Sequence, residues 1–393
     1  MIYDFETLVS RKNTGSGKWD EMTKEHPNLP ENVAPLSVAD MELKNPPEIV
    51  EGLKKYIDTH ILGYTGPTEE YFDAVCGWMK RRNDWDIKKE EIISTHGVVT
   101  ALAVSVLAYT DPGDGVITMP PVYYPFRMTI EHNNRKNVEC PLINTNETYT
   151  IDFDLFEKLC AEEKNKMFIF CNPHNPVGRV WTEEEIAKLG AICAKHNVIV
   201  VSDEIHSDLI MPGHKHVAFA NACKDALPKY LVCTAPSKTF NLATLQTSNI
   251  VIPDEELRTK FQSILHFTPS AGALGLEACR LGYTECEGWL AEVIDLIYKN
   301  YKNFCKFIDV NCPGVTYSDL QGTYLMWIDC TTFGLDDEAL DKLLRKHDLF
   351  CDAGTLFSQG GTMHTRVNLA GPEKMLNAAM QRFKDAYDEA KNA

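Results

Sequence analysis

Apolar residues follow two different periods along the chain. Short apolar runs typical of buried strands occur at residues 116–119, 167–171, 198–202 and 230–235. Apolar residues at helical spacing occur at residues 48–59, 71–82, 100–109 and 183–195. Thr182 and the acidic residues that follow it predict the start of the last of these helices. Strands separated by helices in this way predict an α/β fold, with a mostly parallel sheet and helices on both of its faces.

The pattern changes near residue 285. Residues 1–45 combine polar turns with short apolar pieces, so we expect an arm without a core of its own. After residue 285 come a long helical pattern at 289–307 and an antiparallel-looking strand at 323–329. We therefore predict an N-terminal arm (1–45) that contributes to a small domain, a large domain (46–285) and a C-terminal small α+β domain (286–393).

Charge and cysteine usage narrow the class of protein. The 393 residues carry 56 acidic and 39 basic side chains, and the net charge of −17 disfavours binding to nucleic acid. The N-terminus has no apolar core of signal-peptide length, and no apolar run approaches membrane-spanning length, so we expect a cytoplasmic protein without a membrane partner. The 13 cysteines are scattered singly, without a CxxC or HExxH motif, which indicates reduced thiols and gives no support for a metal.

Lys238 is the candidate nucleophile. It follows the apolar strand 230–235 directly, and open α/β sheets bind their ligands at the carboxyl ends of their strands. A lysine amine in such a crevice forms a Schiff base with an aldehyde cofactor when its surroundings disfavour its charged form. Taken alone, an ordinary surface lysine is the more common explanation.

Polar side chains also follow the neighbouring strands. Asp203 ends strand 198–202, where an ionised carboxylate needs a partner, either a pyridinium nitrogen or the start of a following helix. Asn175 lies in the proline-rich turn NPHNPVG, where its amide either donates to a phenolate oxygen or stiffens the loop. Tyr123 and Tyr124 offer an aromatic face and a phenol for proton transfer, or simply fill space.

Three weaker signals concern charge. Val98 and Val99 follow a glycine at the start of a helix, where backbone N–H groups cradle a phosphate or form a plain turn. His206 would share a helical side with Asp203 if a helix begins there, although a satisfied core histidine is the default. Arg366 is isolated among apolar residues and needs a carboxylate partner, either a substrate or an internal acid.

The order of these residues is more specific than any one of them. An asparagine, an aspartate 28 residues later, a lysine after 35 more and a late arginine resemble the layout of fold-type I pyridoxal-phosphate enzymes, the aspartate aminotransferase superfamily. The motifs VADMELKNPP, LGYTGPTEEYFDAV, PPVYYPF, CNPHNPVGRVWTEEE, VVSDEIHSDLI, PSKTFN and GTYLMWID resemble its cystathionine β-lyase branch, the cystalysin-like carbon–sulfur lyases. The resemblance extends from Tyr3 to Ala370.

The resemblance implies that the large domain binds pyridoxal 5'-phosphate and assigns a role to each candidate. Lys238 would hold the cofactor covalently and later move the α-proton, and Lys238 or Tyr124 would assist the leaving group. The other implied contacts are Asp203 with the pyridine nitrogen, Asn175 with the ring hydroxyl, Tyr123 with the ring face, Val98, Val99 and Ser237 with the phosphate, and Arg366 with the substrate carboxylate. Tyr64 would reach the phosphate of a neighbouring subunit's cofactor, which implies a homodimer.

Four positions depart from the pattern of the superfamily. Thr244 replaces a usual glycine beside the lysine motif, and the loop 357–366 before the arginine differs. Gln246 lies where aminotransferases commonly carry a phosphate-binding arginine, and His206 lies where they place a tyrosine.

We therefore expect a β-lyase that eliminates a thiol from a cysteine-type amino acid and yields pyruvate and ammonia. An aminotransferase is the alternative enzyme, because it uses the same residues. A regulatory protein that kept the fold and lost the chemistry is the non-enzymatic alternative, although it has no need to retain Lys238, Asp203, Asn175 and Arg366 together.

Overall fold

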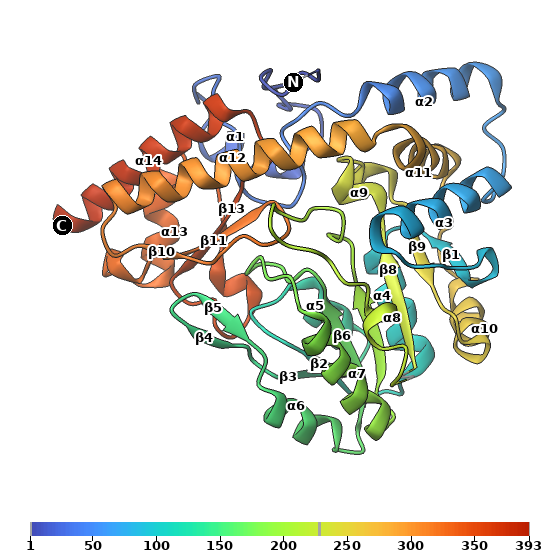
Figure 1. The fold of residues 1–393 in the computed structure, drawn as a ribbon. Helices are drawn as coiled ribbons and strands as arrows, with labels where there is room; N and C mark the ends of the chain where they lie inside the picture. Colours follow the sequence, from blue (N-terminus) through green and yellow to red (C-terminus); the bar gives the residue numbers. More distant parts are fainter. Residues whose placement is uncertain (1, 227–228, 393) are drawn as a thin grey trace.

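The computed structural model describes residues 2–226 and 229–392. The central element of the described residues is a seven-stranded sheet in the order β1-β9-β8-β7-β6-β2-β3 (Figure 1). The strands are β1 (Ile92–Thr95), β2 (Gly115–Thr118), β3 (Lys136–Glu139), β6 (Asn165–Cys171), β7 (Ile199–Asp203), β8 (Tyr230–Thr234) and β9 (Ser248–Val251). Five of them, from β3 to β8 across the sheet, run parallel, which confirms the predicted α/β architecture. β9 is antiparallel to β8 and to β1, an orientation that its four-residue sequence, SNIV, does not reveal.

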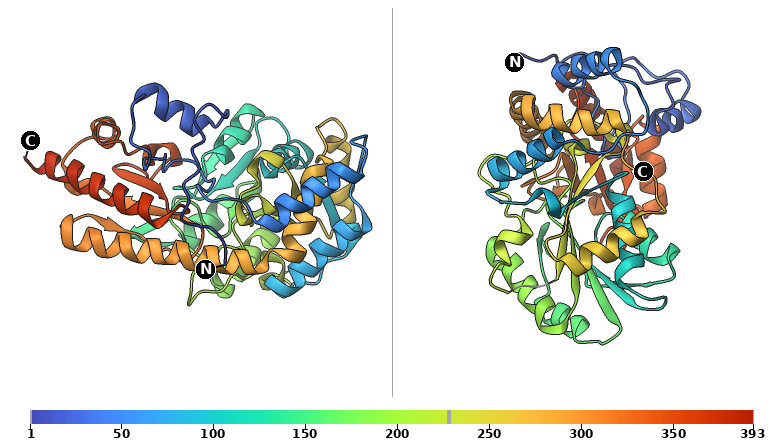
Figure 2. Two further views of the ribbon diagram at one scale, coloured as in Figure 1. Left: turned by 90° about the horizontal axis from the view of Figure 1, so that it is seen from above. Right: turned by 90° about the vertical axis from the view of Figure 1, so that its right-hand side faces the viewer.

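Helices cover both faces of this sheet (Figure 2). One face packs against α4 (Val98–Tyr109), α5 (Pro125–His132) and α10 (Glu255–Leu265), and the other packs against α6 (Phe153–Cys160), α7 (Glu183–His196) and α8 (Phe219–Ala222). Side chains of β6 alternate between the faces, so Met167 and Ile169 join the core beneath α4 while Phe168 and Phe170 join the opposite core. The predicted start of α7 is confirmed, because Thr182 and Glu185 form a capping box.

A second, antiparallel sheet lies toward the C-terminal end of the chain. Its strands are β10 (Thr316–Tyr317), β11 (Leu325–Asp329), β13 (His364–Asn368) and β12 (Asp352–Ala353), in that order. It is accompanied by α13 (Asp337–Lys346), α14 (Glu373–Asn392) and the 25-residue helix α12 (Glu287–Asn311). Helix α12 extends from α11 (Ala273–Glu285) toward the C-terminal helices (Figure 1). The predicted strand 323–329 is confirmed as β11. The strand β13 was not located in the sequence, because within HTRVN only Val367 is apolar. Arg366 therefore has mostly polar neighbours in the strand, and not the apolar ones first assigned to it, although all five residues are buried.

Residues 1–45 form a helix that was not predicted from the sequence, and its buried side chains join the main core of the molecule. They contain helix α1 (Gly17–Glu25), in which Trp19 and Met22 are almost completely buried. The helix is polar apart from this one pair of large apolar side chains, which is too short a stripe to recognise in sequence. Beyond α1 the arm pairs with the C-terminal half, where Leu36 N–H donates to Phe350 O and Asn368 N–H donates to Leu36 O.

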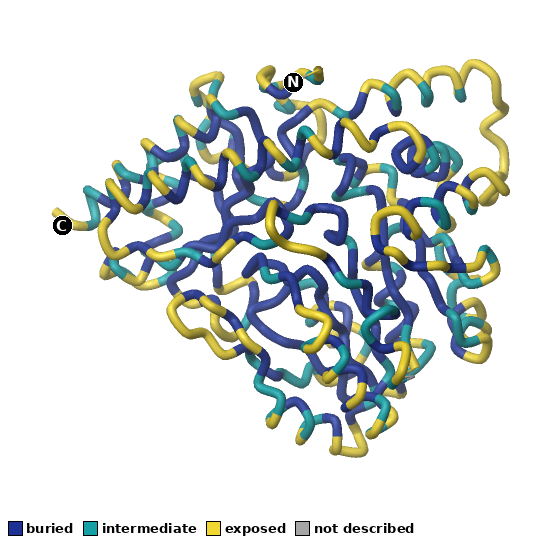
Figure 3. Tube along the Cα trace, viewed as in Figure 1, coloured by how far each residue is buried: buried dark blue, intermediate teal, exposed yellow. Residues whose placement is uncertain are grey.

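Two elements project from the main body. The β4–β5 hairpin (Ile143–Thr145 and Thr148–Thr150) leaves the large sheet after β3 and lies beside the second sheet (Figure 1). The loop between α2 (Pro47–Thr59) and α3 (Glu69–Asn83) is exposed along its length (Figure 3), and Ile61 and Tyr64 have almost no cover. In the described part of the chain, no helix has the length and apolar character needed to cross a membrane.

Helix α11 (Ala273–Glu285) supports the segment that carries Lys238, and this contact yields a stability prediction. A Cβ at Gly282 would lie 2.7 Å from the ring of Phe240, two residues after that lysine. We expect Gly282→Ala to lower the free energy of unfolding by about 1–3 kcal/mol, because overpacking outweighs the gain of less than about 1 kcal/mol in helix propensity.

Urea unfolding measures this change, with Gly288→Ala in α12 as the matched control. There the added Cβ meets only the Tyr3 hydroxyl at 3.6 Å, so the control should be neutral or stabilising. Equal stability of the two variants would contradict the prediction.

Candidate active site

A cleft opens where the carboxyl ends of β6, β7 and β8 meet the start of α4. The described residues that line it are Ala39, Gly97, Val98, Val99, Tyr123, Cys171, Asn175, Asp203, Ile205, His206, Ser237, Lys238, Ala243, Gln246 and Thr247. Most of the residues singled out from the sequence therefore meet in one place. Parallel strands bring this about, because their carboxyl ends share one edge of the sheet.

Lys238 lies in the cleft on the single-turn helix α9 (Pro236–Thr239), which begins where β8 ends. Its Nζ donates to the backbone carbonyl of Ala39 at 2.7 Å. Burial lowers the pKa of Lys238 to about 8, and the charge of Arg366 acts in the same direction while Asp40 and Asp203 oppose it. The amine therefore exchanges a proton near neutral pH, as a nucleophile or a proton carrier must.

Asp203 is the last residue of β7 and is buried, with Oδ1 accepting the Ile205 N–H at 3.2 Å. Burial raises the pKa of this carboxyl to about 7, against the effects of that hydrogen bond and of Lys238. The chain continues as a turn, so the alternative in which Asp203 caps a helix is wrong. Among the described residues Asp203 has no salt bridge, so the carboxylate is suited to a cationic ligand.

His206 lies in the same turn and is buried at the edge of the cleft, with its ring edge-on to Tyr324. Burial, together with the charges of Lys238 and Arg366, holds the pKa of His206 well below its usual range, so the imidazole is neutral. Its Nδ1 has no hydrogen-bond partner within the described chain. The expectation of a satisfied core histidine is therefore wrong, and the free nitrogen is available to a ligand.

Arg366, on β13 of the second sheet, does not line the cleft itself but lies next to it, bonded to the cleft residue Asn175. Its Nη2 and Nε donate to Asp352 Oδ2 at 2.5 and 3.2 Å, and its Nη1 donates to Asn175 Oδ1 at 2.9 Å. Phe357 lies 4.7 Å from the guanidinium carbon. The sequence left open whether a substrate or an internal acid pairs with this arginine, and the structure shows the internal acid. The bond to Asn175 orients that amide so that its nitrogen is the remaining donor.

The segment 38–40 was quoted from the sequence without a role and proves to connect the two sides of the cleft. Ala39 O accepts hydrogen bonds from Lys238 and from the Tyr324 hydroxyl, the latter at 2.8 Å. Val38 has a φ of 58°, an unfavourable left-handed conformation for a β-branched residue. Its N–H donates to Asp352 Oδ2 at 3.0 Å, so the acid that holds Arg366 also holds this strained residue.

The start of α4 has the form of an anion site. Gly97 has a φ of 80° and precedes Val98 and Val99, the first helical residues, whose N–H groups lack intrahelical acceptors. This left-handed conformation favours glycine, and a Cβ there would also lie 2.5 Å from the side-chain oxygen of Gln246. Thr244 lines a separate hollow next to Arg11 and Asn241.

Besides Arg366, two residues selected from the sequence lie outside this cleft. Tyr124 precedes α5, and its ring centroid lies 6.0 Å from that of Phe357, beside the arginine. Tyr64 is fully exposed on the loop between α2 and α3. Other residues at the site were missed because nothing in the sequence links them to it. Ala39 contributes only a carbonyl, Tyr324 directly precedes β11, and Asp352 lies on β12.

Comparisons with known proteins agree with this geometry. The chain is 40% identical over 386 residues to cystathionine beta-lyase PatB of Bacillus subtilis (strain 168), an alignment that covers 98% of this chain and 99% of that protein. The crystal structure of cystalysin from Treponema denticola, which contains a pyridoxal 5'-phosphate cofactor, superposes with a TM-score of 0.96 at 46% identity, covering 99% of this chain and 100% of cystalysin.

A pyridoxal-phosphate-bound C–S lyase from Staphylococcus hominis superposes with a TM-score of 0.92 at 30% identity, over 98% of this chain and 98% of that lyase. The family model for aminotransferase class I and II matches residues 31–383. The chain therefore belongs to the aminotransferase class I and II family.

Proposed function

We propose that the protein is a pyridoxal-phosphate-dependent carbon–sulfur β-lyase that eliminates a thiol from a cysteine-type amino acid to give pyruvate and ammonia. The observation that carries this proposal is the pairing, in one cleft, of Lys238, whose pKa is lowered to about 8, with the buried carboxylate of Asp203. The names of two similar proteins, a cystathionine beta-lyase and a C–S lyase, support the reaction class.

The residues of the cleft fit the cofactor group by group. Asp203 provides a buried anion for the ring nitrogen, and His206 and Asn175 provide polar atoms for the ring hydroxyl. The ring of Tyr123 lies at the cleft wall, where it covers a ring face. The phosphate would be held by the N–H groups of Val98 and Val99 and by the Ser237 hydroxyl.

Bound there, pyridoxal phosphate supplies an aldehyde for amines and a ring that withdraws electrons from the substrate's α-carbon. Lys238 would hold the cofactor, and its free amine would take the α-proton of the substrate. Arg366 would bind the substrate's α-carboxylate. Its hydrogen bonds to Asp352 and Asn175 hold the guanidinium in position for this contact. Tyr124, beside Phe357, or Lys238 protonates the departing thiolate.

We also propose the wider organisation implied by the sequence. Residues 46–285 form the large cofactor-binding domain, and residues 286–393 form the small domain together with the arm 1–45. The exposed loop that carries Ile61 and Tyr64 packs on a second subunit, because apolar side chains so fully exposed suit an interface. The active unit is then a homodimer, and the 13 free cysteines favour a cytoplasmic location.

The reaction class is tested by adding excess L-cystathionine to the purified protein loaded with pyridoxal phosphate. We expect a visible absorption band and release of pyruvate without a keto acid. Lys238→Ala should lose both the band and the product, whereas Lys229→Ala, on the surface, should keep both. Pyruvate that appears only after a keto acid is added would indicate an aminotransferase, and the absence of the band would exclude both enzymes.

The buried charge of Asp203 has a predictable cost in the cofactor-free protein. Its pKa is raised from about 3.9 in the unfolded chain to about 7, so the folded state loses stability as pH rises from about 4 to 7 and the loss is complete above 7. Asp203→Asn should therefore raise the unfolding free energy of the cofactor-free protein by about 2–4 kcal/mol at pH 8.

The gain should be much smaller at pH 5, and the same variant should lose most of its lyase activity, because the amide cannot pair with a cationic ring. Thermal unfolding at the two pH values measures the first effect. A variant that is less stable than wild type at pH 8 would contradict this role of the buried charge.

The shared active site is tested by complementation. Lys238→Ala and Tyr64→Ala subunits are each expected to be nearly inactive, but a hybrid dimer contains one site with both residues intact. Equal mixing with subunit exchange should recover about one quarter of wild-type activity, since half of the dimers are hybrids and each has one such site. Activity that stays at the level of the separate variants would show that Tyr64 does not act on the neighbouring subunit.

A further inference from the structure

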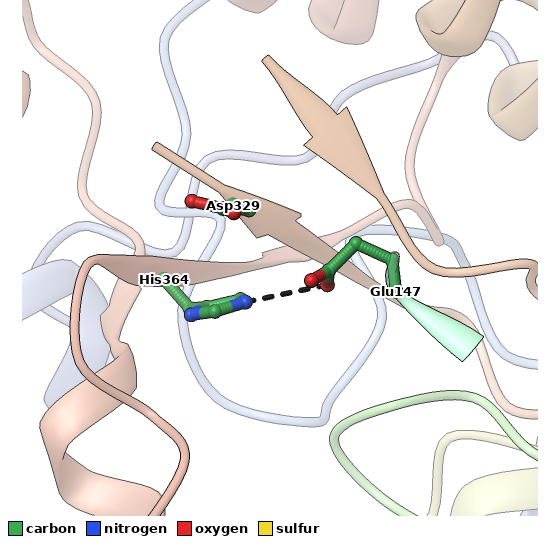
Figure 4. A group of neighbouring side chains, drawn as sticks. All are labelled: Glu147, Asp329 and His364. Carbon is green, nitrogen blue, oxygen red and sulfur yellow. Dashed lines mark hydrogen bonds and ion pairs between the residues drawn. The ribbon is translucent and has the colours of Figure 1, made fainter. Parts of the chain in front are cut away.

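A cluster of ionisable side chains lies outside the cleft, where the β4–β5 hairpin meets the second sheet (Figure 4). Glu147 stands in the hairpin turn, His364 begins β13 and Asp329 ends β11. Their ligand atoms lie within 4.8 Å of one another, and Glu147 and His364 are buried. The cluster thus joins two parts of the chain that are more than 200 residues apart.

The hydrogen bonds of His364 determine its protonation. Its Nδ1 lies 2.8 Å from the carbonyl oxygen of Thr362, and its Nε2 lies 3.3 Å from Glu147 Oε2. A carbonyl and a carboxylate are both acceptors, so each ring nitrogen has to donate. A neutral imidazole has one N–H and cannot satisfy both, whereas the imidazolium ion does.

Glu147 is ionised by the same reasoning. The Tyr149 hydroxyl accepts the Trp327 Nε1–H at 3.0 Å and an Asn144 N–H at 3.1 Å, so its own proton points to Glu147 Oε2 at 3.3 Å. Asn144 Nδ2 also donates to Glu147 Oε1 at 2.8 Å. These residue types suit a divalent cation, but the protein's own donors already occupy both carboxylate oxygens, which favours a proton over a metal.

The cluster is connected to Arg366 through two aromatic rings. The His364 ring stacks on Trp327, with centroids 4.9 Å apart and planes at 15°. Trp327 meets Phe357 edge-on at 5.4 Å, and Phe357 lies under the guanidinium of Arg366. His364 and Arg366 are two residues apart on β13 and so project to the same face of the strand. A shift of His364 would therefore be transmitted to the support of Arg366.

We propose that Glu147 and His364 form an ionic brace that positions Arg366 for the substrate's α-carboxylate, and that the brace holds only while His364 is protonated. The proposal rests on the proposed function, since it assumes that Arg366 binds a carboxylate. Glu147 and His364 are thus positioning residues that tune substrate affinity without touching the substrate.

The surroundings of His364 favour its charge. Burial opposes the charged form, but the hydrogen bonds to Glu147 and Thr362 and the nearby carboxylate of Asp329 prevail, so the pKa of His364 is raised above its ordinary value of about 6.5. Helix α13 also lies near His364, and its acid Asp337 accepts a hydrogen bond from the Met363 N–H. A raised pKa means that the brace is complete below about pH 6.5 and is lost as pH rises through the pKa of the folded state.

The test compares steady-state kinetics of holoenzyme variants between pH 6 and pH 9. We expect His364→Gln and Glu147→Gln to raise KM about three- to tenfold at pH 6 while kcat and the cofactor absorption band are unchanged. For His364→Gln the ratio of variant to wild-type KM should fall toward one by pH 9, where the wild-type brace is also lost. The double variant should match the single ones, because the pair acts as a unit.

Two controls make the result specific. His347→Gln removes a histidine that contacts Glu389 at 3.0 Å between α13 and α14, away from the cleft, and should leave KM and its pH dependence unchanged. Arg366→Lys should raise KM at every pH, which shows that KM reports carboxylate binding. A KM ratio that does not vary with pH, or a metal ion retained by wild type but not by His364→Gln, would overturn the brace.

A readout that needs no substrate separates this proposal from the proposed function. Histidine NMR of the holoenzyme, with the His364 resonance assigned by its loss in His364→Gln, should show titration above pH 6.5. Titration below that value would overturn the brace. If wild type releases no pyruvate while the resonance titrates as expected, the proposed reaction fails and the charged pair stands.

Discussion

Burial of charge in one cleft is the constraint on which the structure depends. Lys238 and Asp203 line it, and Arg366 from the second sheet contacts it through Asn175. A charged group out of water is costly unless it is paired. The three are treated differently. Arg366 is fully paired by Asp352, Lys238 has only a backbone carbonyl and a lowered pKa, and Asp203 has a raised pKa and no counter-ion among the described residues. The two incompletely paired groups are those to which chemistry is assigned.

The architecture follows from the need to hold these groups together. Parallel strands β6, β7 and β8 place Asn175, Asp203 and Lys238 along one sheet edge, and β13 brings Arg366 across from the second sheet. The N-terminal arm connects the two sheets at this site. The carbonyl of Ala39 accepts a hydrogen bond from Lys238 Nζ, and the neighbouring Val38 N–H donates to the Asp352 carboxylate. A left-handed valine is unfavourable by itself, and its presence shows that the surrounding bonds overcome a local preference.

The sequence was most informative for strands that are buried on both faces of the sheet, because these read as continuous apolar runs. The apolar runs of β6, β7 and β8 and the helix after Thr182 were predicted within a few residues. Elements whose burial depends on distant partners were missed. β13 reads as polar because its buried side chains are satisfied by residues far away, and α1 has only Trp19 and Met22 to mark its inner face.

By itself the sequence determined the α/β architecture and the candidates that follow the strands, because both depend on spacing along the chain and on the topology of parallel sheets. Only the tertiary structure decided which partner each charge has. Asp352 for Arg366, the Ala39 carbonyl for Lys238 and Glu147 for His364 lie 14, 199 and 217 residues from their partners. Such pairs are set by how the two sheets and the arm pack together, and no local pattern records that packing.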